Sequence, residues 1–113
     1  MEIKENQRYI LFKIIAEEEI DQNQLIKVLW RQLFQLYGEF GTSQTGLWMI
    51  EYDKNRGYGI IRTNTDALPM VRTTLAIIRQ VNGKRCILVT LGTSGTIKAL
   101  KKKHFQKINK DAQ

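Results

Sequence analysis

Four runs of β-branched and aromatic residues, interrupted by two helical patterns, constrain the fold of this chain more than any other feature. The runs are RYILFKII at 8–15, GLWMIEYD at 46–53, GYGIIRT at 57–63 and RCILVTL at 85–91. Each run is typical of a β-strand. Apolar residues at three- and four-residue steps predict one helix over 22–37 and a second marked by Leu68, Val71, Leu75 and Ile78. The order β-α-β-β-α-β predicts an α+β, ferredoxin-like or RNA-recognition-like sandwich.

Short polar and glycine-rich segments mark where these elements begin and end. Asp21 or Asn23 can cap the first helix, Gly38 stops it, and GEFGTSQTG after it is a predicted loop. KNRG at 54–57 and NGK at 82–84 are predicted turns. Pro69 must lie in the first turn of the second helix. After the fourth strand, GTSGT opens an extra C-terminal helix that runs through KALKKKHF.

The predicted sheet is apolar on both faces. In the second strand Leu47 and Met49 alternate with Trp48, Ile50 and Tyr52, and the fourth strand alternates two apolar sets in the same way. A sheet with one wet face alternates more cleanly between apolar and polar residues. Two helices cover one face, so we expect the other to be covered by the C-terminal helix or by another protein.

The strand RGYGIIRT resembles the third-strand signature of RNA-recognition domains. Arg56, Gly57, Tyr58 and Gly59 fit its first four positions, but the two later aromatic positions hold Ile60 and Thr63. Stacking on one base contributes only about 1–3 kcal/mol. We therefore interpret this as a strand whose glycines allow close packing, with Arg56 and Arg62 able to reach phosphates from the edge.

Charge is distributed very unevenly along the chain. Residues 1–53 hold five Lys/Arg and nine Asp/Glu, a balance of −4, whereas residues 54–113 hold 13 and two, a balance of +11. This asymmetry favours a polyanion, and nucleic acid above all, as partner of the second half. A basic solvated tail is the alternative. A membrane surface is disfavoured because no strongly apolar helical face carries aromatic anchors.

The segment LGTSGTIKALKKKHFQK, residues 91–107, is the strongest candidate for RNA contact. Gly92 and Gly95 permit a tight turn into the helix, and free N–H groups at a helix start attract phosphate. The candidate residues here are Thr93, Ser94, Gly95, Thr96, Lys98, Lys101, Lys102 and Lys103. The simpler interpretation is that Ser94 or Thr96 caps the helix and the lysines form its wet face. Both can hold, and such backbone contacts would carry no base-sequence information.

No catalytic constellation is evident. Cys86 lies in an apolar run and is interpreted as a buried thiol, and the single His104 leaves no His/Cys metal cluster. The acids Glu17, Glu18, Glu19 and Asp21 are interpreted as solvated. The length predicts one domain over 1–113, and the absence of a long apolar run or a signal-peptide pattern predicts a cytoplasmic protein.

These motifs together resemble the ribonuclease P protein component 2 family of archaea and eukaryotes. The matching segments are RYILFKI, GLWMIEYD, GYGIIR, VRTTLAIIR and LGTSGTIKAL, in the right order over about nine tenths of the chain. LG-x-SGTIK is the most specific of them. Unlike an RNA-recognition domain, this chain lacks paired aromatics, which argues against recognition by base stacking and leaves open whether Tyr58 stacks on a base.

The resemblance implies a non-catalytic, RNA-binding subunit of the ribonucleoprotein that removes the 5′ leader from precursor tRNA. It implies an RNA-recognition-like fold and no cofactor on this chain, since the catalytic RNA performs the cleavage with magnesium. The implied partners are that RNA, precursor tRNA within the holoenzyme, and the TIM-barrel-like ribonuclease P protein component 3, with which it can form a 2:2 heterotetramer. By carry-over, Ser94, Gly95, Thr96 and Lys98 lie nearest the RNA, followed by Arg62 and Arg72.

Two rival functions come from other classes. Small ferredoxin-like enzymes such as acylphosphatases hold phosphate in a loop that GTSGT could imitate, but they need a glycine-rich loop straight after the first strand. A pure protein scaffold is the second rival, because both faces of the sheet are apolar. It predicts partner binding that survives without RNA and does not respond to salt.

Overall fold

The computed structural model describes residues 6–103. The strands in this range form one antiparallel sheet with the order β2-β3-β1-β5-β4. The elements are β1 Gln7–Ala16, α1 Gln22–Ser43, β2 Trp48–Asp53, β3 Tyr58–Asn64, α2 Leu68–Ile77, β4 Gln80–Val81 and β5 Lys84–Ser94. Residues 97–103 are helical and are called the C-terminal helix below. The central strand β1 lies between β3 and β5, as the split βαβ order requires. The predicted α+β class is confirmed.

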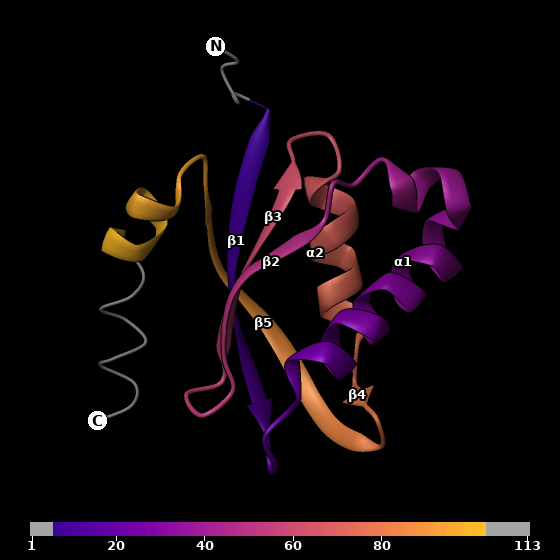
Figure 1. Cartoon of the computed structure of the whole chain (residues 1–113), viewed down its shortest axis with the longest axis vertical. Coiled ribbons are helices and arrows are strands. Elements are labelled where there is room, and N and C mark those ends of the chain that lie inside the picture. Colours follow the sequence, from indigo (N-terminus) through magenta and orange to yellow (C-terminus); the bar gives the residue numbers. More distant parts are fainter. Residues whose placement is uncertain (1–5, 104–113) are drawn as a thin grey trace.

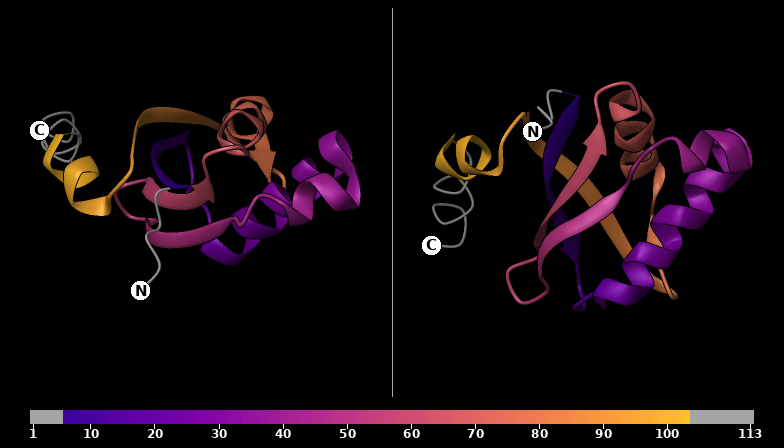
Figure 2. Two further views of the ribbon diagram at one scale, coloured as in Figure 1. Left: turned by 90° about the horizontal axis from the view of Figure 1, so that it is seen from above. Right: turned by 45° about the horizontal axis from the view of Figure 1, so that its top comes forward.

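Helices α1 and α2 lie on the same side of the sheet and enclose the main core (Figures 1 and 2). Side chains from every layer meet there, with Phe12 of β1, Leu25 and Leu33 of α1, Ile61 of β3 and Leu75 of α2 all fully buried. Alternation along β1 sends Ile10, Phe12 and Ile14 to this face.

The opposite face, called the open face below, is covered in part by the C-terminal helix. Leu100 is fully buried there in a second cluster with Leu11, Tyr58 and Ile60. Figure 1 shows this helix on the side of the sheet away from α1 and α2. The expectation that the second face needs a cover is confirmed, and the C-terminal helix supplies part of it. The same face stays exposed farther along β1 and β5, at Ile15 and Ile87.

The predicted helix boundaries are mostly confirmed. The Asp21 carboxylate accepts from the Gln24 N–H and caps α1, and Pro69 lies in the first turn of α2. Gly38 interrupts α1 with φ of +75°, a conformation that suits glycine. The predicted loop after it is partly wrong, because residues up to Ser43 form a further helical stretch. Its last carbonyls are satisfied locally, since the Thr45 hydroxyl donates to Thr42 O.

One irregular pairing changes which residues of β2 face which side of the sheet. Met49 pairs with Ile61 but Glu51 with Ile60, so Ile50 is an extra residue in β2. This bulge moves Tyr52 to the main core with Met49, where its hydroxyl donates to Ile20 O at 2.6 Å. The prediction that Tyr52 shares a face with Trp48 and Ile50 is therefore wrong.

The fourth predicted strand is longer than expected and has a short partner. β5 continues to Ser94, which pairs with Tyr9, so Gly92 lies within the strand and not in a tight turn. β4 adds a two-residue fifth strand. The turn between β4 and β5 is confirmed: Asn82 and Gly83 both have positive φ, as a type I′ hairpin requires. Phe105, placed on the last helix by sequence, lies outside the described residues.

The glycines of the GYG motif serve close packing. A Cβ on Gly59 would lie 2.6 Å from the Phe12 ring and 3.1 Å from Tyr52, so the aromatic rings occupy the space that a side chain would need. Gly57 has φ of +70°, and a Cβ there would lie 2.9 Å from the carbonyl oxygen of Ile14. Close packing thus explains the two glycines that make this strand resemble an RNA-recognition signature.

We predict that Gly59→Ala destabilises the protein by about 1–3 kcal/mol, because an added methyl group overpacks the Phe12 contact. Denaturant unfolding measures the change. Gly95→Ala is the matched control, since its Cβ meets nothing closer than 3.7 Å and its φ is not positive. Equal stability of both variants would contradict the packing role of Gly59.

Candidate nucleic-acid interface

The turn from β5 into the C-terminal helix is built by hydroxyl caps. Thr96 Oγ1 accepts from the Ala99 N–H at 3.1 Å, and Ser94 Oγ accepts from the Thr96 N–H at 3.3 Å. Thr96 is thus the N-cap residue, which confirms the capping interpretation. Thr93, Gly95 and Thr96 are exposed and Ser94 is half-buried. RNA contact at this turn stays a prediction.

The lysines that follow divide into two kinds. Lys98, Lys102 and Lys103 are exposed, and residues 94–103 contain no Asp or Glu. Lys101 differs, because its Nζ lies 2.7 Å from Glu51 Oε1 in a half-buried ion pair. Three of the four predicted lysines therefore face solvent, and the fourth holds the helix to the sheet.

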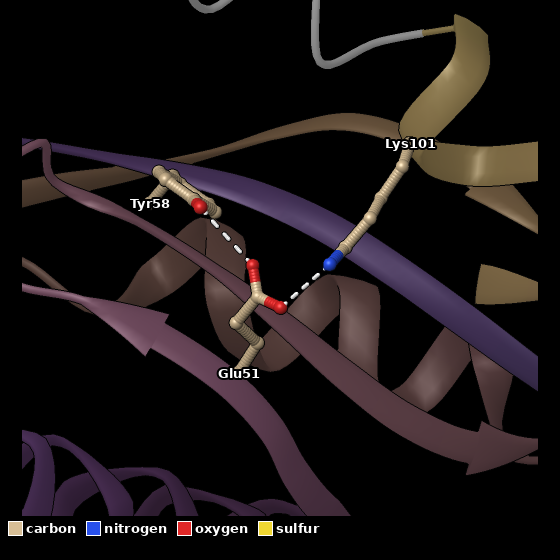
Figure 3. A network of polar contacts seen from close by, with 3 residues as sticks. All are labelled: Glu51, Tyr58 and Lys101. Carbon is tan, nitrogen blue, oxygen red and sulfur yellow. Dashed lines mark hydrogen bonds and ion pairs between the residues drawn. The ribbon is translucent and has the colours of Figure 1, made fainter. Parts of the chain in front are cut away.

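Glu51 joins the C-terminal helix to the hairpin of β2 and β3 (Figure 3). One carboxylate oxygen receives Lys101, and the other accepts from the Tyr58 hydroxyl at 3.0 Å. The Arg56 guanidinium lies 5.5 Å from the centre of the Tyr58 ring, within range of a cation–π contact. Arg56 and Lys101 are in this way connected through Tyr58 and Glu51, although 45 positions separate them.

Burial and the Glu51 contact together raise the pKa of the Tyr58 phenol to about 12, with burial the larger cause. The neutral phenol is favoured because it donates to a carboxylate in a place with little water. Burial likewise raises the pKa of Tyr52 to about 12, with Asp21 adding to the effect.

Tyr58 is unavailable for base stacking in this structure. Its side chain is 5% exposed and is covered together with Ile60 by Leu100. RNA-recognition domains stack bases on exposed aromatics of this strand. Here the C-terminal helix occupies that place, so the structure leaves no room for a base to stack on Tyr58.

Arg8 is a neighbour of this turn that sequence reasoning missed. Its Nη1 lies 3.7 Å from the Cβ position of Gly95 and donates to Gln7 O at 2.7 Å. Antiparallel pairing of Tyr9 with Ser94 brings the start of β1 beside the end of β5. The predicted β-α-β-β-α-β order could have revealed that Arg8 lies near this turn. In the ferredoxin-like arrangement the first and last strands are antiparallel neighbours.

The remaining predicted arginines are not gathered at the turn. Arg62 lies on the open face of β3, between Tyr9 and Trp48 in the pairing register. Arg56 is exposed in the hairpin turn between β2 and β3. Arg72 is exposed on α2, which covers the other face, so the structure separates it from the C-terminal helix.

Residues 6–103 hold no group of three or more His, Cys, Asp or Glu placed to bind a metal ion. His104 lies outside this range. Burial raises the pKa of the Cys86 thiol, which confirms a buried thiol and disfavours a nucleophile.

The connection from β1 to α1 holds the acids Glu17–Glu19 and no glycine, which argues against an acylphosphatase-type loop. None of the helices in this part of the chain has the length and apolar character to cross a membrane.

The sheet order, with two helices on one face and a third across the other, defines an α+β fold of the ferredoxin-like, RNA-recognition-like class. A chain in the cryo-EM structure of yeast ribonuclease MRP has the same fold, with a TM-score of 0.68 and 15% identity over 99% of this chain and 98% of that one. The profile of the Rpp14/Pop5 family matches residues 8–105, and the chain belongs to this family.

Curated archaeal relatives agree with this assignment. Ribonuclease P protein component 2 of Archaeoglobus fulgidus is 40% identical over 105 residues, covering 92% of this chain and 93% of the relative. The protein of the same name from Pyrococcus horikoshii is 35% identical over 105 residues, covering 93% and 88%. The resemblance found in the sequence is confirmed.

We predict that the free energy of unfolding falls between about pH 10 and pH 12 partly because Tyr58 ionises. A phenol whose pKa is raised in the folded state stabilises the protein fully below pH 10, and this contribution is lost toward pH 12. Tyr58→Phe should therefore lose about 1 kcal/mol less than the parent between pH 9 and pH 11. Denaturant unfolding at both pH values measures this, and an equal loss in both proteins would contradict it.

Proposed function

We propose that this chain is a non-catalytic RNA-binding subunit of ribonuclease P. In this role it supports the catalytic RNA in the endonucleolytic removal of the 5′ leader from precursor tRNA. The observation that carries the proposal is membership of the Rpp14/Pop5 family over residues 8–105, with relatives named ribonuclease P protein component 2. The basic, acid-free segment 94–103 supports an RNA-binding role.

RNA binds, in this proposal, along the turn Ser94–Thr96 and the exposed side of the C-terminal helix. Lys98, Lys102 and Lys103 present charge to phosphates, and Arg8 adds a guanidinium beside Gly95. Arg62 lies on the same open face of the sheet. Lys101 contributes by holding the helix through Glu51 and not by direct contact. Contacts of this kind recognise the shape and charge of a folded RNA.

The enzyme in this proposal is the ribonucleoprotein, and this chain carries no catalytic residue or cofactor of its own. Magnesium serves the RNA subunit. The proposed protein partner is ribonuclease P protein component 3, in a heterotetramer with two copies of each chain. Precursor tRNA is met within the holoenzyme, in the cytoplasm.

A physical reason links the lysines to magnesium. A large RNA folds against the repulsion of its own phosphates, and divalent ions screen that repulsion. Lysines fixed near the fold of the RNA replace part of this screening, so less magnesium is needed. The expected signature is a steep salt dependence, with a log–log slope of about −0.7 for each phosphate neutralised on single strands.

The first experiment is cleavage of precursor tRNA by the cognate catalytic RNA at limiting magnesium. One reaction contains protein component 3 alone, and the other contains protein component 3 together with this chain. The proposal predicts efficient removal of the 5′ leader only in the second reaction. Unchanged cleavage would contradict the proposal.

A second prediction locates the RNA contact. Lys102→Ala with Lys103→Ala should flatten the log–log salt slope of RNA binding by roughly 1.4, because two phosphate contacts are lost. Lys27→Ala with Arg31→Ala removes the same charge from exposed positions of α1 and should leave the slope unchanged. Filter binding over a series of salt concentrations measures both. An equal change in the two double variants would show that net charge, and not the C-terminal helix, determines binding.

A further inference from the structure

The outer edge of β5 has backbone groups that no strand of residues 6–103 pairs. β4 covers only Lys84 and Arg85, and the hydrogen bonding ends where the Cys86 N–H donates to Arg79 O at 2.9 Å. Outward-pointing groups recur at every second residue of an antiparallel strand, so those of Leu88 and Thr90 also point away from β1. Figure 1 shows β5 continuing well past the short strand β4.

A groove of about 440 Å³ runs along this edge. Its walls are Ile87, Leu88, Val89 and Thr90 of β5, and Arg72, Thr73, Ala76 and Arg79 on and just after α2. A second hollow, of about 610 Å³, shares Ile87 and Arg79 with the first and extends toward Ile15 and Arg85. The two hollows together extend along the unpaired part of β5 and its junction with β4.

Apolar side chains are exposed where an added strand would lie. Ile87 and Val89 are 48% and 37% exposed, and Ile15, the cross-strand partner of Ile87, is 54% exposed. Soluble proteins protect sheet edges with Lys, Pro or a covering segment. Here Ile87–Thr90 contains neither Lys nor Pro. Such an edge is suited to β-augmentation, in which backbone hydrogen bonds give affinity and alternate side chains give specificity.

The charge around the groove indicates what kind of segment fits. Arg72, Arg79 and Arg85 line the two hollows, whereas Glu17 is the single acid among the lining residues. A second copy of this chain would bring a like-charged edge to this one. RNA would gain little, because exposed Ile87 and Val89 and the outward carbonyl oxygens offer nothing to phosphates. A polypeptide with carboxylates matches both the arginines and the hydrogen-bonding edge.

We propose that the outer edge of β5, from Ile87 to Thr90, binds an extended acidic segment of a partner protein as an additional strand. Apolar side chains of the segment pack on Ile87 and Val89, and its carboxylates meet Arg72 and Arg79. Arg72, which the sequence assigned to RNA, therefore belongs to a protein interface. The inference does not depend on RNA binding by the C-terminal helix, which lies across the open face of the sheet.

The test uses the full chain and a fluorescein-labelled peptide of about seven residues in which Val alternates with Glu. Fluorescence anisotropy measures affinity, and ¹⁵N NMR follows the Leu88 and Thr90 amides. We expect the peptide to bind, to shift both amides and to slow their hydrogen exchange. A peptide in which Lys replaces Glu should bind at least tenfold more weakly.

Three variants and two controls test the separate parts of the interaction. Thr90→Pro removes an outward N–H and should weaken binding about tenfold, and Val89→Lys and Arg72→Glu should do the same. Phe40→Lys and Arg31→Glu make the same types of change at exposed positions of α1 and should leave affinity unchanged. A far-ultraviolet circular dichroism spectrum identifies any variant that fails to fold.

Three outcomes would overturn the proposal. The first is that the Leu88 and Thr90 amides do not respond to the acidic peptide at any concentration up to the millimolar range. The second is that a single-stranded RNA oligonucleotide shifts these amides while the peptide does not. The third is that light scattering shows a dimer in which the Leu88 and Thr90 amides are protected from hydrogen exchange without any peptide. None of these bears on cleavage of precursor tRNA, so the two proposals can fail separately.

Discussion

The burial of β1 on both of its faces is the constraint on which the rest of the structure depends. Phe12 faces α1 and α2 and is fully buried, and so is its neighbour Leu11 on the open face. A strand of this kind can be stable only if each face of the sheet has its own cover. The two helices of the sandwich cover one face, and Leu100 of the C-terminal helix covers the other. The basic segment is therefore part of the fold and not a tail attached to it.

This arrangement combines packing and the proposed RNA contact in a single helix. Ile97 and Leu100 face the sheet, and Lys98, Lys102 and Lys103 face solvent. The ion pair of Lys101 with Glu51 lies between these two sides and sets the orientation of the helix. A half-exposed ion pair of this kind adds little stability, about 0–1 kcal/mol, so Lys101 helps to hold the helix while apolar burial contributes more.

Much of the fold could be predicted because the apolar residues recur with a clear period of two in the strands and of 3.6 in the helices. The close packing at the GYG motif and the capping of the last helix could be predicted from the residue types at those positions. Tyr52 was placed on the wrong face because a β-bulge at Ile50 leaves no mark in local alternation. The contacts of Glu51 with Lys101 and of Arg8 with the Gly95 turn join residues far apart in the chain, which no local pattern reveals. The end of β5 was missed because Gly92 is typical of a turn, whereas pairing with Leu11 keeps it extended.

The central position of β1 also affects how the chain folds as it is synthesised. β1 precedes every strand with which it pairs, and Leu11 must wait for Gly92, 81 positions later, before its last neighbour is made. Closing such a long loop has a high entropic cost, and topologies rich in these contacts fold slowly. Before β3 is made, β1 has no partner on either side, and after that it still lacks its partner β5. One edge of β1 therefore stays unpaired in the nascent chain until β5 leaves the ribosome, and its open face is covered later still, when Leu100 of the C-terminal helix packs on Leu11.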